Sequence, residues 1–244
     1  MKRLCLVILA VFCFKPIYAQ MDNARLLEYY QSQQYAKAVD YLKQAFPEPV
    51  TDIKILTQLA YASNMANRLP DAEGYYQRIY NTDTTNAGVL YSMAGINLRR
   101  GNDTKAGFYY QKILQTDTTN YLVYNQLARI ALDRKNIPAV IAYLQKANQL
   151  NPGDADIAAQ LSDYYTNLQF FDKAASVLAK AAENDPEDVT LLIALSKLHY
   201  KQQKWPETIS DYLQLIQLGA SGGDVLNHLG IAYFKQKNYS CGAE

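Results

Sequence analysis

The chain has 244 residues, of which 49% are hydrophobic and 19% are charged, and its formal net charge is +1. This composition excludes a long disordered polymer, because enough apolar side chains are present to build a continuous core. The near-neutral charge and the lack of a long basic run argue against a nucleic-acid partner.

Residues 1–19 have the layout of a secretory signal peptide. A positive start precedes an unbroken apolar run from Leu4 to Phe14, and Ala19 is the predicted cleavage site. The run is shorter than the ~20 residues that a membrane-spanning helix needs, although an uncleaved anchor is an alternative. We therefore predict a periplasmic or secreted mature chain, residues 20–244, that is not an integral membrane protein.

The strongest signal is a self-similar pattern in which a small residue recurs every 34 positions. Apolar residues stand at fixed offsets around it, three or four positions apart, so each period holds two amphipathic helices. The small positions are Ala60, Ala94, Ala128, Ser162, Ser196 and Gly230.

Turn residues separate these helices. Pro70, Pro138 and Pro206 occupy one column of the pattern, where proline suits the first turn of a second helix. Segments such as Asp83 to Asn86 join one period to the next and supply N-cap residues. We read the pair Asp154 and Asp156 as caps of this kind.

A 34-residue helix–turn–helix unit with this pattern resembles the tetratricopeptide repeat family. The resemblance implies an all-α fold, a right-handed α-solenoid of tandem repeats whose first helices line a concave groove. In the first unit Leu26 replaces the small residue. The predicted units are 19–52, 53–86, 87–120, 121–154, 155–188, 189–222 and a partial unit 223–244.

The resemblance also implies a protein or peptide partner, held in the groove by first-helix side chains off the core stripe. The alternative is that these side chains form an ordinary solvated face. The Lys and Asn clamp with which some family members bind a C-terminal carboxylate is absent. The candidate groove residues are Tyr61, Tyr91, Asn125, Gln126, Arg129, Asp163 and Lys197.

The residues give no basis for a catalytic site, a metal site or a cofactor. His199 and His228 lie in different units without a second ligand at helical spacing, and His199 is expected to be packed in the core. No phosphate-binding loop is present. An enzyme acting on glycans is the alternative from another class, and it would require a cluster of titratable groove residues.

The predicted last helix, roughly Asp224 to Gln236, is apolar where a terminal repeat should be polar. Either the sequence is a fragment, or this end docks on a second copy or another subunit. Cys241, the one cysteine outside the signal, leaves a disulfide-linked dimer open. The predicted function is an exported interaction scaffold; the alternative is an accessory subunit of an envelope assembly or transport complex, docked through this end.

Overall fold

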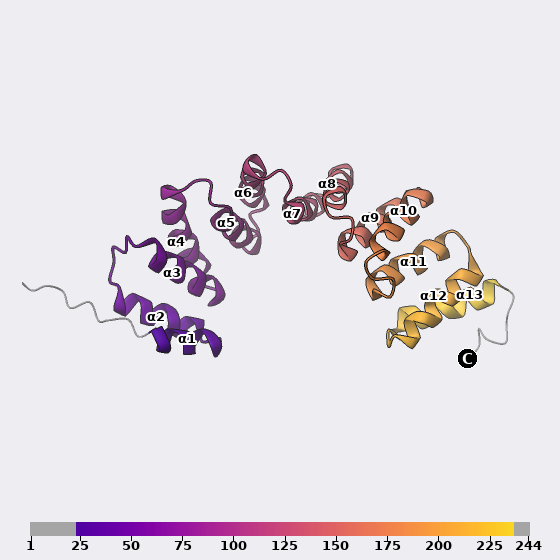
Figure 1. The fold of residues 1–244 in the computed structure, drawn as a ribbon, viewed down its shortest axis with the longest axis horizontal. Helices are drawn as coiled ribbons and strands as arrows, with labels where there is room; N and C mark the ends of the chain where they lie inside the picture. The colour runs from indigo at the N-terminus through magenta and orange to yellow at the C-terminus, as the bar shows by residue number, and fades with distance from the viewer. Residues whose placement is uncertain (1–22, 237–244) are drawn as a thin grey trace, which may run out of the picture. The chain divides into compact units, whose positions relative to one another are not determined.

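The computed structural model describes residues 23–236, so the predicted signal peptide and Cys241 lie outside the described residues. The described residues form thirteen α-helices and no strand, which confirms the predicted all-α helical repeat fold (Figure 1). They fall into two compact units, one that ends at Gly101 and one that begins at Asn102. Within each unit, helices that follow one another in the chain pack against each other.

The first unit holds five of these helices and the second holds eight. The helices of the first unit are α1 (Asn23–Gln31), α2 (Tyr35–Ala45), α3 (Ile53–Met65), α4 (Leu69–Thr82) and α5 (Ala87–Arg99). The helices of the second unit are α6 (Asp103–Thr116), α7 (Tyr121–Asp133), α8 (Ile137–Leu150), α9 (Ala155–Asn167), α10 (Phe171–Ala182), α11 (Val189–Lys201), α12 (Trp205–Gln217) and α13 (Gly223–Lys235).

Side-chain caps recur at the start of the first helices α3, α5, α7, α9 and α11. The Asp154 carboxylate accepts the backbone N–H of Ile157 at 3.0 Å, and this satisfies one of the donors that a helix start leaves unpaired. Gly222 takes this position before α13 and has no side chain to offer. The five residues that cap in this way are Asp52, Asn86, Asn120, Asp154 and Asp188.

The turn between the two helices of a pair places one residue in the left-handed backbone region. The backbone N–H of the following residue can then donate to a carbonyl in the last turn of the first helix. In the turn at Lys135, the N–H of Asn136 donates to the carbonyl oxygen of Ala131 at 2.9 Å. Only one of these six positions is a glycine, although glycine adopts this conformation at least cost. The residues with positive φ in these turns are Gln33, Asn67, Gly101, Lys135, Gln169 and Gln203, and Gly219 adopts the same region between α12 and α13.

The core runs along the faces that the helices turn toward each other. Its small residues allow close approach: Ala60 and Ala94 are fully buried in the first unit, and Ser162 and Ser196 are fully buried in the second. Large side chains such as Leu144 fill the space beside them. The recurring small column of the sequence is therefore a packing feature.

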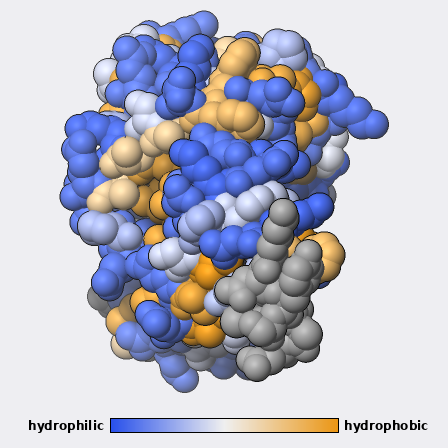
Figure 2. All heavy atoms as spheres, turned by 90° about the vertical axis from the view of Figure 1, so that its right-hand side faces the viewer, coloured by the Kyte–Doolittle hydropathy of each residue, from blue (hydrophilic) through white to orange (hydrophobic). Residues whose placement is uncertain are grey.

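The last described helix leaves apolar side chains uncovered. Leu226 of α13 is 51% exposed, whereas Leu56, Leu90 and Leu192 at the same position of other repeats are 3%, 1% and 6% exposed. Phe234 is exposed as well. Figure 2 faces this end of the second unit and shows apolar side chains among polar ones.

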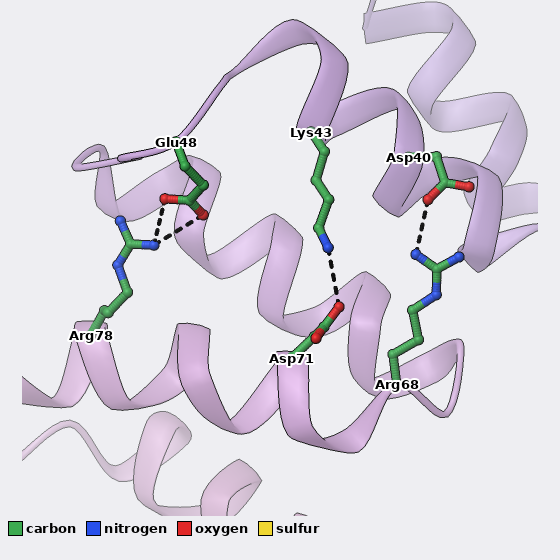
Figure 3. A network of polar contacts seen from close by, with 6 residues as sticks. All are labelled: Asp40, Lys43, Glu48, Arg68, Asp71 and Arg78. Carbon is green, nitrogen blue, oxygen red and sulfur yellow. Dashed lines mark hydrogen bonds and ion pairs between the residues drawn. The ribbon is translucent and has the colours of Figure 1, made fainter.

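Three ion pairs join α2 and the segment after it to α4 in the first unit (Figure 3). Asp40 pairs with Arg68 at 2.9 Å, and Lys43 pairs with Asp71 at 3.1 Å. Glu48 pairs with Arg78 at 2.9 Å. The Arg68 hydrogen bond lowers the pKa of Asp40, and the Asp71 hydrogen bond raises that of Lys43. These pairs connect the second helices of adjacent repeats.

Candidate partner-binding surface

In the first unit, two candidate groove residues are exposed tyrosines. Tyr61 of α3 and Tyr91 of α5 are 44% and 38% exposed. The Tyr61 ring lies edge-on to the rings of Tyr30 and Tyr35, at centroid distances of 5.9 and 6.2 Å. Burial raises the pKa of Tyr30, and its buried hydroxyl has no hydrogen-bond partner among the described residues. The three rings form an aromatic cluster beside the α1–α2 turn.

In the second unit, three candidates lie together. Asn125, Gln126 and Arg129 of α7 line a cavity of about 150 Å³, across from Gln160 and Tyr164 of α9. This opening between two first helices is narrow and polar. Sequence reasoning grouped the three α7 residues in the groove, but it left out Tyr164 of α9, which also lines the cavity.

A second cavity continues the first. Its volume is about 330 Å³, and its lining adds Asp163 and Asn167 to Leu132, Gln160 and Tyr164, which also line the first cavity. We call the combined surface the polar trough. Its residues are Asn125, Gln126, Arg129, Leu132, Gln160, Asp163, Tyr164 and Asn167.

The hydrogen-bonding groups of the polar trough are largely unused. The Gln126 Oε1 is buried and accepts no hydrogen bond from any described residue. No hydrogen bond or ion pair joins the side chains of Asn125, Arg129 or Gln160 to the rest of residues 23–236. A buried acceptor requires a donor, and an N–H of a bound partner or a water molecule can supply it to Gln126.

The remaining candidate, Lys197 of α11, pairs with Asp163 of α9 at 3.4 Å. Lys197 also lines a cavity of about 450 Å³ between α11, α12 and α13. We call this cavity the terminal pocket. Its lining is Ile193, Ser196, Lys197, Tyr212, Ala220, Gly222, Gly223, Asp224, Val225 and His228.

Aromatic rings support one wall of the terminal pocket. The His228 ring stacks on that of Tyr212 at 5.9 Å with an interplanar angle of 7°. Its Nδ1 lies 2.7 Å from the backbone carbonyl oxygen of Asp224. Because a carbonyl oxygen can only accept a hydrogen bond, Nδ1 is the donor, and the Nε2 of the ring does not take part in this contact. Burial raises the pKa of Tyr212. Sequence reasoning considered His228 only as a metal ligand and missed this pocket.

His199 is mostly buried, as expected, but it has a charged partner that the sequence did not reveal. Its Nδ1 lies 2.7 Å from the Oδ2 of Asp211, and the two side chains are 19% and 12% exposed. The corresponding positions of the previous repeat are Tyr165 and Val177, which pack in an apolar core. The pair therefore replaces apolar packing between α11 and α12 with a polar contact.

Within the described residues, no group of three or more His, Cys, Asp and Glu side chains is arranged to hold a metal ion. None of the helices in this part of the chain has the length and apolar character needed to span a membrane.

Residues 159–223 match the family described as Tetratricopeptide repeat. This segment carries tetratricopeptide repeats. The fold of the C-terminal part of a TPR repeat-containing protein from Cytophaga hutchinsonii matches with a TM-score of 0.74 at 18% identity, over 90% of each chain. A tetratricopeptide repeat protein from Parabacteroides merdae gives a TM-score of 0.62 at 15% identity, over 90% of this chain and 87% of the other.

Pseudomonas aeruginosa pilF gives a TM-score of 0.62 at 18% identity, over 88% of this chain and 94% of the other. At these identities the likeness to other tetratricopeptide repeat structures shows the fold alone. No curated protein matches the chain in sequence. The polar trough and the terminal pocket therefore have to be interpreted from their own residues.

Proposed function

We propose that this chain is an exported interaction scaffold that binds a protein or peptide partner on the first-helix face of its second unit. The tetratricopeptide repeat fold supports a role in protein–protein interaction, and proteins of this kind are generally non-catalytic. The partner contacts the polar trough, whose amide, guanidinium and hydroxyl groups suit the main chain and side chains of a polypeptide.

The unpaired hydrogen-bonding groups of the trough carry this proposal. The Gln126 Oε1 has no donor from the described residues, so its acceptor site is open to a partner N–H or to water. A partner that supplies this donor takes the place of the water. Arg129 is exposed, and no described carboxylate pairs with it, so its charge is also available to the partner.

Selection of a random peptide library on the purified chain tests the proposal. We expect enriched peptides to lose about tenfold in affinity for the Gln126→Leu and Arg129→Gln variants. The control is Lys180→Gln, which removes one exposed positive charge from α10, and it should bind like the unaltered chain. No enrichment, or equal binding by all variants, would refute the proposal.

Export is a separate part of the proposal, supported by the signal-like residues 1–19. After expression with a C-terminal tag and cell fractionation, the mature chain should begin at Gln20 and lie outside the cytoplasm. A cytoplasmic chain that still begins at Met1 would rule this part out.

The second candidate function is that of an accessory subunit that docks through α13. The exposure of Leu226, where the equivalent leucines are buried, favours this role. Affinity purification after envelope fractionation separates the two functions. One stoichiometric partner that is lost in Leu226→Glu favours docking, whereas several weak partners that are lost in Arg129→Gln favour the trough.

A further inference from the structure

We call the polar trough and the terminal pocket of the second unit together the track. The two openings share no lining residue, but Asp163 lines the trough, Lys197 lines the pocket, and their ion pair of 3.4 Å joins the two linings. The track follows the first helices α7, α9 and α11 and ends at α13. A single extended chain lying on this surface would contact both openings.

The two ends of the track differ in chemistry. At the α7 end, amide groups surround Arg129, which pairs with no described carboxylate. Asp163 and Lys197 offset each other, so the cation of α7 is the one uncompensated charge among the described residues of the trough. A ligand carboxylate placed there would gain charge-assisted hydrogen bonds.

At the α13 end, the lining is mainly apolar. Ile193, Ala220 and Val225 surround the opening together with the face of the buried Tyr212 ring. A volume of about 450 Å³ is large enough for a leucine or phenylalanine side chain. Burial of such a side chain removes apolar surface from water, which favours an apolar group over a charged one.

The separation of the two ends sets the spacing of the ligand. The track crosses two helix intervals from α7 to α11, of which α9–α11 is a packed contact and α7–α9 is separated by the cavity of the trough. Packed helices lie ~8–10 Å apart, and we take the upper value for both intervals. An extended peptide advances ~3.3 Å for each residue. A span of about 20 Å therefore corresponds to about six residues.

We propose that this track binds an extended peptide that places a carboxylate side chain on Arg129 and, about six residues away, a large apolar side chain in the terminal pocket. The main chain between them pairs with the amides of Gln126 and Gln160. This inference rests on the proposed function, because it specifies the partner of the same surface.

The library selection is extended to test this ligand. Enriched peptides should contain Asp or Glu and a large apolar residue, in either order, at a separation of about six. Replacing the acidic residue by its amide should weaken binding about tenfold on the unaltered chain, but should make little difference on Arg129→Gln. Replacing the apolar residue of the peptide by Ala should lower the affinity of the peptide for the unaltered chain. The same replacement should not lower its affinity for the Val225→Asp variant.

Val225→Asp puts a charge at the pocket while placing an acidic residue in the first turn of α13, where the helix dipole favours it. Circular dichroism checks that both variants are folded. Enriched peptides without the acidic and apolar pair, or variants that keep both preferences, would overturn the two-point ligand and leave peptide binding intact. A library without any enrichment would overturn the proposed function as well.

Discussion

The Nζ of Lys197 lies 3.4 Å from the Oδ2 of Asp163, one repeat earlier at the same position of its helix. Their side chains are 52% and 42% exposed, so water screens the attraction. We predict that Asp163→Asn changes the free energy of unfolding by less than about 0.5 kcal/mol. The same substitution should strengthen the binding of acidic peptides, because it frees the Lys197 charge. Urea unfolding and fluorescence anisotropy measure the two effects, and a large loss of stability would contradict the screening argument.

Asp154 should contribute more to the free energy of unfolding than the exposed ion pair does, because its carboxylate satisfies a backbone donor at the start of α9. Asp154→Ala should lower the free energy of unfolding by about 1 kcal/mol. Asp156 lies in the first turn of α9 and interacts with the helix dipole, so Asp156→Ala should cost less, about 0.3 kcal/mol. Urea unfolding of both variants measures which of them is less stable. An equal loss of stability would show that the cap hydrogen bond does not set the contribution of Asp154.

Substitutions at two left-handed turn residues should change the free energy of unfolding in opposite directions. Gly101 has φ of 72°, and a Cβ built there meets no atom within 4 Å, so the cost of Gly101→Ala comes from the backbone alone. We expect a loss of about 1 kcal/mol. Lys135→Gly, at the equivalent turn with φ of 55°, should raise stability by up to about 0.5 kcal/mol. Thermal unfolding of both variants tests this, and a stabilising Gly101→Ala would refute it.

The ion pairs between α2 and α4 predict an acid-sensitive contribution to stability. The Arg68 hydrogen bond lowers the pKa of Asp40, so the pair stabilises the fold above the ordinary carboxyl pKa of ~4 and is lost as the pH falls through the lowered value. Asp40→Asn should therefore be less stable than the unaltered chain near neutral pH, by less than about 0.5 kcal/mol since the pair is exposed. Urea unfolding at about pH 7 and about pH 2.5 should show this difference disappearing at the lower value.

Much of the fold was predictable from local pattern. Ala60, Ala94 and Ala128 recur at one interval because each lies where two helices come closest, and all three are buried. The caps were predictable for a similar reason, since Asp154 bonds to a backbone group only three residues away. Helix periodicity and N-caps depend on residues a few positions apart, so they can be read from the sequence.

The candidate site was less predictable, because it depends on which side chains of different helices meet. Gln126 and Gln160 occupy one sequence column, yet nothing local indicates that Tyr164 and Leu132 close the cavity between them. Similarly, His199 and Asp211 meet across a turn that sets the register of α11 against α12. The 34-residue period continues across the division of the chain after Gly101, so the period does not mark this division.

Every described helical pair carries its own turn, and five first helices carry their own side-chain cap, so each pair holds most of what it needs to form. Its remaining requirement is an adjacent pair to cover its apolar face. Where this cover is thin, a helix opens locally at a lower cost in free energy, and α13 buries two residues where α9 buries six. Backbone amides of α13 should therefore exchange with deuterium sooner than those of α9.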